Sequence, residues 1–270
     1  MKRKTILFFY LLLLTIGLAY ETQSLTEGWM SGSQYGIVGL STLILLVYAL
    51  PAVWALFYFA KKWKLSWVPV LFSLLGGGFV AGWLSSFANT YFHDMVQAVA
   101  PNSAFWNQYE SAIAAPLFEE PFKLLPIFFV LYLYSVRRIK SIFLLAIASG
   151  LGFQIVEDFA YIRQDLPGGF SYTVSGILGR VANAPMSHWV YTGLVMLGLL
   201  LLAQVRKGRK DLLVPAWGYF IAGFALHFVG NSPFSQIVTE LPIAIPLLNA
   251  VGLFLIYQAY QTIEKVEQDK

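Results

Sequence analysis

The stretch 113–135, IAAPLFEEPFKLLPIFFVLYLYS, has the length and apolar composition of a membrane-spanning helix, apart from three charged residues near its middle. These residues are Glu119, Glu120 and Lys123. Ionised groups at such a depth are costly, so they persist where they pair with one another, meet water in a cavity or take part in chemistry. The stretch therefore predicts both a membrane helix and a functional site within it.

The composition of the whole chain agrees with a membrane protein. Of its 270 residues, 58% are hydrophobic and only 12% are charged, about half the charged fraction of a soluble domain. The absence of cysteine excludes disulfides, thiolate nucleophiles and cysteine-based metal sites. No linker or change of composition divides the chain, so we expect a single membrane domain over residues 1–270.

Eight apolar segments are long enough to be membrane helices, so we expect an all-α, polytopic fold. The predicted segments are 5–20, 36–60, 67–88, 113–135, 141–162, 184–204, 212–231 and 242–262. In the longest connection between them, 89–112, apolar residues from Tyr91 to Val99 recur at helical spacing, so we expect it to lie along the membrane surface. It is either an interfacial connector or a lid that guides the substrate over the site.

The basic residues indicate the orientation of these segments. All but three of the 18 lysines and arginines lie in five groups, one at every second segment boundary: 2–4, 61–64, 137–140, 206–210 and 265–270. The positive-inside rule then places both termini in the cytoplasm. The net charge of +4 does not indicate a nucleic-acid partner, because most basic residues flank apolar segments and set their orientation. We therefore expect the lipid bilayer as a partner and no nucleic acid.

With this topology, four segments bring polar side chains to one layer in the outer half of the membrane. The segments that follow 113–135 contribute Glu157, then His188, then His227 and Asn231. Lys123 is three and four residues from the two glutamates and can pair with either of them. We expect one shared, hydrated site. Nearby, we expect Asp158 to be hydrated and Arg180 to be an interfacial anchor.

At these residues the chain resembles the PrsW family of intramembrane proteases. That family carries an E-E-x-x-K motif, an F-x-x-x-E motif and two later helices with histidine. The corresponding residues here are 119–123, 153–157, His188 and 227–231. The resemblance covers about 110–235, the expected catalytic core. The pattern is also similar to the wider group of CAAX prenyl proteases and Abi proteins, which have E-E-x-x-x-R and F-x-x-x-H instead.

The resemblance implies an intramembrane protease in a bacterial plasma membrane. Its expected substrate is a single-span, membrane-anchored regulator such as an anti-sigma factor, cleaved near the outer face. The expected catalytic residues are Glu119, Glu120, Lys123, Glu157, His188, His227 and Asn231. Either Glu119 or Glu120 is expected to act as the general base, with Lys123 balancing charge.

The sequence leaves two mechanisms open, one without a metal and one with zinc. Two imidazoles and one carboxylate form a known catalytic zinc set, which His188, His227 and Glu157 can supply. H-E-x-x-H is absent, which argues against the zincin type of site. Two other functions also remain open: an ion-coupled transporter that uses the buried groups as a proton relay, and a non-catalytic scaffold or immunity-type protein.

Overall fold

The computed structural model describes residues 2–26, 30–236 and 243–268, and within them every regular element is a helix. The longer helices are α1 Lys2–Thr26, α2 Gly32–Lys62, α3 Trp67–Leu75, α4 Gly82–Val99, α5 Ala104–Tyr134, α6 Ile139–Asp165, α7 Gly169–Asn183, α8 His188–Arg206, α9 Leu213–Asn231 and α10 Ala244–Gln268. A π-helical turn, Gly76–Ala81, joins α3 to α4, so 67–99 is one continuous helical stretch. Short 3-10 turns occupy Leu166–Gly168, Lys210–Leu212 and Pro233–Gln236.

The predicted all-α fold is confirmed for this part of the chain, and each of the eight predicted segments coincides with a long helix. Only residue 242, the start of the last segment, lies outside the described residues. Within the described residues, five stretches are long and apolar enough to cross a membrane: Lys2–Gln23, Gly32–Lys62, Trp67–Val99, Ile139–Arg206 and Lys210–Asn231. The count of eight spans and the cytoplasmic termini stay predictions.

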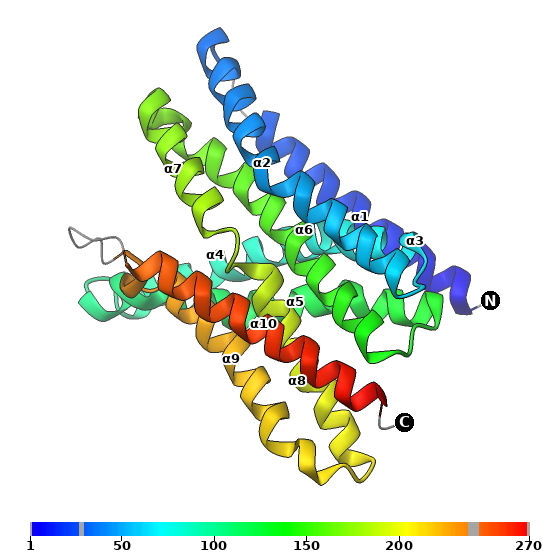
Figure 1. Ribbon diagram of the computed structural model, residues 1–270. Helices are drawn as coiled ribbons and strands as arrows, with labels where there is room; N and C mark the ends of the chain where they lie inside the picture. Colours follow the sequence, from blue (N-terminus) through cyan, green and yellow to red (C-terminus); the bar gives the residue numbers. More distant parts are fainter. Residues whose placement is uncertain (1, 27–29, 237–242, 269–270) are drawn as a thin grey trace.

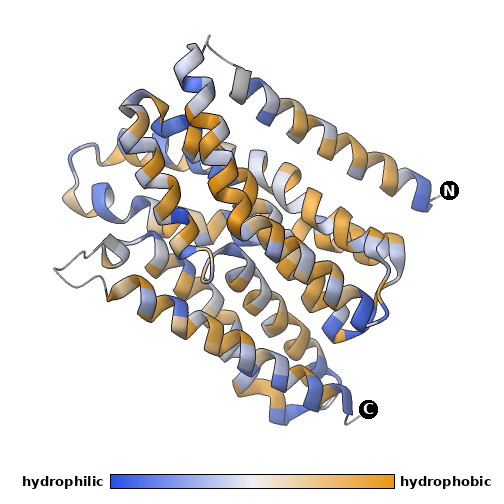
Figure 2. Cartoon of the chain, turned by 45° about the horizontal axis from the view of Figure 1, so that its top comes forward, coloured by the Kyte–Doolittle hydropathy of each residue, from blue (hydrophilic) through white to orange (hydrophobic). Residues whose placement is uncertain are grey.

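The basic groups gather at one end of the bundle. Arg3 near the start of α1 donates to Ser135 Oγ in the α5–α6 connection at 2.7 Å. Lys140 at the start of α6 pairs with Glu267 at the end of α10 at 3.2 Å. Both termini lie at this end (Figure 1), where Figure 2 shows hydrophilic residues at the helix ends. The arrangement agrees with the predicted alternation of basic boundaries.

Helix α6 is the centre of the fold. It contacts α2, α3, α5, α7 and α8, and its residues 148–154 are buried without interruption. A helix that is apolar on all sides is expected at such a position. Helix α8 packs on one side of it, with α9 packed on α8, and α2 and α3 pack on the other side (Figure 1). The polar residues of α6 therefore face the interior of the protein.

Close approach between the π-helical turn and α6 depends on glycine. A Cβ atom added at Gly77 would lie 1.9 Å from the carbonyl oxygen of Ser149. A Cβ atom added at Gly152 on α6 would lie 1.8 Å from the carbonyl oxygen of Leu74. Two helix backbones can touch in this way only where a side chain is absent.

Replacing Gly77 with alanine is expected to lower the free energy of unfolding by about 1–3 kcal/mol, since backbone atoms would have to move apart. Thermal unfolding of the purified protein in detergent measures the effect. The control is Gly36→Ala on α2, where an added Cβ meets no atom within 4 Å. Alanine there should leave stability unchanged or slightly higher. Equal melting temperatures for the two variants would contradict this account of the packing.

Candidate active site

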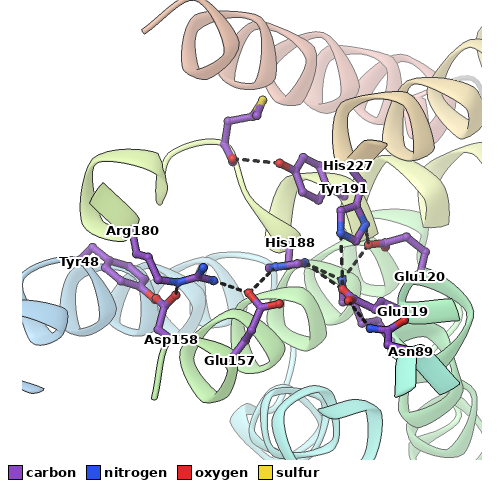
Figure 3. A network of polar contacts seen from close by, with 12 residues as sticks. Tyr48, Asn89, Glu119, Glu120, Glu157, Asp158, Arg180, His188, Tyr191 and His227 are labelled. Atoms are coloured by element: carbon purple, nitrogen blue, oxygen red, sulfur yellow. Dashed lines mark hydrogen bonds and ion pairs between the residues drawn. The ribbon is translucent and has the colours of Figure 1, made fainter. Parts of the chain in front are cut away.

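A cluster of buried polar side chains lies where α4, α5, α6, α8 and α9 meet (Figure 3). Its centre is formed by Glu119, Glu120 and Lys123 on α5, with His188 on α8 and His227 on α9. None of these five residues is more than 5% exposed. The structure thus brings together most of the residues predicted from the sequence.

Local sequence features place these side chains. Helix α5 continues through Pro116, Pro121 and Pro126, so both glutamates and Lys123 stay on one helix. Before α8, Pro185 lies in the short connection between α7 and α8, where a residue without an N–H is tolerated. His188 is then the first residue of α8, where the Ser187 carbonyl accepts hydrogen bonds from the next turn.

The Lys123 ammonium connects the acidic and imidazole groups. Its Nζ atom lies 3.2 Å from Glu119 Oε2, 2.9 Å from Glu120 Oε1 and 2.7 Å from His188 Nδ1. It also lies 4.0 Å from the centre of the Phe153 ring, within cation–π range. Since an ammonium has only donors, the His188 Nδ1 atom accepts, and a lone pair of this imidazole points into the cluster.

Each histidine lies between two carboxylates. We call the ring nitrogen that faces Glu119 the inner nitrogen, and the one that faces Glu157 or Glu120 the outer nitrogen. His188 Nε2 lies 3.0 Å from Glu157 Oε2, and His227 Nδ1 lies 2.9 Å from Glu120 Oε1. The inner nitrogens, His188 Nδ1 and His227 Nε2, lie 3.7 Å and 3.5 Å from Glu119 Oε2. A carboxylate on the outer nitrogen is the usual companion of a metal-binding histidine, because it fixes the tautomer and the ring orientation.

His227 has unused hydrogen-bonding capacity. Its Nδ1 atom lies 2.9 Å from Glu120 Oε1, whereas its Nε2 atom has no hydrogen-bond partner among the described residues. The ring is 1% exposed and stacks on Tyr191, with ring centres 4.8 Å apart. A buried imidazole held in this way, with one nitrogen unpaired in this part of the chain, is suited to bind a ligand.

Glu119, His188 and His227 form a group that can hold a metal ion, with one ligand atom of each lying within 4.8 Å of the others. Ligand atoms around a tetrahedral zinc with bonds of about 2.1 Å lie about 3.4 Å apart. The 3.5 Å and 3.7 Å separations from Glu119 Oε2 are close to this value. The residues present therefore fit a divalent metal.

This ligand group differs from the predicted set in its carboxylate. The prediction combined both histidines with Glu157, whereas the structure places Glu119 between their inner nitrogens and Glu157 on the outer side of His188. The rotation and depth of α5 and α6 decide which glutamate meets both rings. Sequence spacing does not contain that information.

The charges of the cluster also suit a cation. Four carboxylates and two cations are joined in it: Glu119, Glu120, Glu157, Asp158, Lys123 and Arg180. If all are ionised and the imidazoles are neutral, two net negative charges remain. Uncompensated buried charge is unfavourable, and a divalent ion would neutralise it.

Asp158 and Arg180 belong to the cluster, contrary to expectation. Asp158 was expected to be hydrated, but it is 1% exposed and bonds to both Arg180 and Tyr48. Arg180 was expected to be an interfacial anchor, but it also pairs with Glu157. The available signal was weak: Arg180 is one of three cations outside the basic groups. Its partners lie on α6, and the packing of α7 against α6 brings them together.

Two further hydrogen-bonding residues were missed. Asn89 Nδ2 on α4 donates to Glu119 Oε1 at 3.1 Å, and Thr192 Oγ1 on α8 donates to Glu120 Oε2 at 2.8 Å. Asn89 was assigned to a surface connection, but α4 extends to Val99. Thr192 lies one turn after His188, a spacing that placed it on the same face.

Two cavities meet at Glu157 and Tyr161, which line both of them. The larger one, of about 520 Å³, lies between α1, α4 and α6 and reaches Glu119; we call it the α4–α6 cavity. The smaller one, of about 230 Å³, is lined by residues of α6–α10 and of the connections between them, including His188 and Asn231. Asn231 is exposed at the end of α9. Glu120 lines neither cavity.

Comparison with known proteins agrees with the geometry of the cluster. The family model described as PrsW family intramembrane metalloprotease matches residues 65–259, more than half of the chain. The match contains every residue of the cluster except Tyr48. No curated protein and no solved structure matches the chain. The chain therefore belongs to the PrsW family of intramembrane metalloproteases, and it is a peptidase with several apolar helices of membrane-spanning length.

Proposed function

We propose that this protein hydrolyses a peptide bond in a single-span, membrane-anchored regulatory protein, such as an anti-sigma factor, near the outer face of a bacterial plasma membrane. The observation that carries the proposal is the convergence of Glu119, His188 and His227 on one buried point. Beside that point lies a cavity large enough for part of a peptide. The proposed topology has eight spans with cytoplasmic termini, and the basic groups gathered at one end support it.

Zinc is the metal that suits these ligands. Two histidines and one glutamate are a known catalytic set for it, and His188, His227 and Glu119 would hold it. When bound, the ion supplies Lewis-acid polarisation of the scissile carbonyl and lowers the pKa of water. Lys123, which competes for His188 Nδ1 and Glu119 Oε2, would then keep its bond to Glu120.

Glu157 is the proposed proton acceptor. Its Oε2 atom takes the contacts with His188 and Arg180, so Oε1 is available to water. It lines the same cavity as Glu119, so a water molecule there has access to both carboxylates. Glu120 has no such access, since its oxygens contact Lys123, Thr192 and His227 in a fully buried position. Glu120 therefore orients His227, as Glu157 also orients His188.

For Asn231, which was expected among the catalytic residues, we propose a role in holding the substrate. It lines the smaller cavity together with Glu157 and Arg180. At this place an amide can hold a polar part of the substrate or of the leaving product.

The purified protein, reconstituted in liposomes, is expected to cleave a fluorogenic single-span peptide. A chelator should abolish cleavage, and added zinc should restore it, because the ion supplies several kcal/mol of transition-state stabilisation. Magnesium, which prefers oxygen ligands, is the control and should not restore activity. Cleavage that persists unchanged after chelation would exclude the metal mechanism. Proton-coupled flux without any cleavage would favour a transporter.

A further inference from the structure

The α4 wall of the α4–α6 cavity carries four polar residues: Ser85, Ser86, Asn89 and Thr90. Ser86 is bonded to Tyr20 at 2.7 Å, and the argument below concerns Ser85 and Asn89. Ser85 and Asn89 are four residues apart, so they lie on one face of α4, and both line the cavity. Across from them on α6 are Val156 and Glu157. The π-helical turn Gly76–Ala81 precedes α4 directly, and such turns often occur at functional sites.

Both residues have polar atoms without a partner. Ser85 is 1% exposed, and neither its Oγ atom nor Asn89 Oδ1 has a hydrogen-bond partner in the described part of the chain. A buried hydroxyl normally finds a carbonyl, as Ser149 Oγ does with Lys123 O at 2.7 Å. Ser41 and Ser73 also have unpaired hydroxyls, but they do not line the α4–α6 cavity. At Ser85 and Asn89 two unpaired polar atoms lie on one face of a cavity that reaches Glu119, where they can meet a polar ligand.

A peptide main chain fits this pattern in a membrane. Intact helices satisfy their own peptide groups, but a segment unwound for cleavage exposes N–H and C=O groups that find no water in hydrocarbon. Asn89 Oδ1 can only accept, which matches a peptide N–H, while a serine hydroxyl can donate or accept. Side chains four apart on a helix lie about 6 Å from each other, close to the two-residue repeat of about 6.8 Å in an extended chain.

We propose that Ser85 and Asn89 bind the main chain of an unwound segment of the membrane-spanning substrate. The inference rests on the proposed function and specifies its substrate class: single-span segments that unwind readily near the cleaved bond, for example at glycine or proline. Asn89 also holds Glu119 Oε1 through its Nδ2 atom. A peptide group bound to its Oδ1 atom is thereby placed beside Glu119.

The first test is Ser85→Ala. Because Ser85 has no partner within the described residues, its loss removes no internal hydrogen bond, and the melting temperature should stay the same or rise. The KM for a fluorogenic single-span peptide should rise about five- to tenfold, the value of one hydrogen bond, with a smaller change in kcat. Matched controls are Ser41→Ala and Ser73→Ala, which remove equally buried and unpaired hydroxyls outside the cavity. These should leave KM unchanged. The same KM in Ser85→Ala as in the controls would overturn the proposal.

A second test locates the bonded peptide group. Single ester bonds replace successive amides of the peptide, each removing one N–H donor. With the wild-type protein, one ester position is expected to raise KM several-fold. With the Asn89→Ala variant, the same ester should not raise KM further. Independent, additive losses at every position would contradict a bond to Asn89.

A binding measurement separates this inference from the proposed function. The Kd of a fluorescent single-span peptide is measured for Glu157→Gln with and without Ser85→Ala. A five- to tenfold weaker Kd in the double variant supports the main-chain site even where the wild type cleaves no peptide, and an unchanged Kd overturns it. Absence of cleavage by the wild type counts against the proposed function alone.

Discussion

Replacing Glu119 with glutamine is expected to remove the bound metal and to lower kcat/KM about 1,000-fold. Glu119 Oε2 is the atom that lies between the two inner imidazole nitrogens, and glutamine offers a neutral amide in place of an anionic ligand. Loss of the metal removes several kcal/mol of transition-state stabilisation, and each 1.36 kcal/mol is tenfold in rate. Metal analysis of the purified variant, together with peptide cleavage, measures both effects.

The matched control for this prediction is Glu120→Gln, the same change at the adjacent residue of α5. Glu120 contacts the outer nitrogen of His227, so its loss should weaken metal binding about 10- to 100-fold without abolishing it. Both variants keep a hydrogen-bonding side chain beside Lys123, and their melting temperatures report whether the fold is intact. Full metal content in Glu119→Gln, or identical losses in the two variants, would contradict the assigned ligand group.

The helices were predictable because hydropathy and basic boundaries follow directly from the physics of the bilayer. An apolar stretch of 20 or more residues has few alternatives, as 36–60 and 141–162 illustrate. The apolar residues of 91–99 have helical spacing, but their continuity with the preceding membrane helix was not predicted. The last turns of α4 contain Asn89, His93 and Asp94, which lowered the hydropathy and suggested a connection, although they continue a helix to Val99. Polar residues on one face of a membrane helix can mark a cavity rather than the end of the helix.

The residues of the candidate site were easier to predict than their contacts. Ordered motifs, similar to those of a known family, singled out Glu119, Glu157 and both histidines. Which carboxylate meets which imidazole depends on rotations of about 100° per residue and on helix depth, so a pattern of letters leaves it open. The bridge from Arg180 to Glu157 and Asp158 joins α7 to α6 through a long-range packing arrangement. Only the tertiary structure shows such a pair.

Replacing Glu157 with glutamine is expected to lower kcat by a factor of about 100 to 10,000, the usual contribution of a general base. The metal should stay bound, because Glu157 contacts the outer nitrogen of His188 and lies outside the ligand group. Glutamine keeps an oxygen that can accept from both Arg180 and His188, so the geometry of the site is largely retained. Pre-steady-state cleavage of the single-span peptide and metal analysis measure the two properties separately.

This pairing of retained metal with lost turnover distinguishes a proton acceptor from a residue that only positions His188. A positioning role predicts that Arg180→Met, which removes the other contact of Glu157, lowers the rate as much as Glu157→Gln does. A proton-accepting role predicts a smaller loss in Arg180→Met, because Glu157 then keeps its charge and its access to the α4–α6 cavity. It also predicts that the rate decline of the wild type at low pH, which reports protonation of the base, is absent from the residual activity of Glu157→Gln. An unaltered pH profile in that variant would assign the proton to another group. Glu119, which also lines this cavity, would be the next residue to examine.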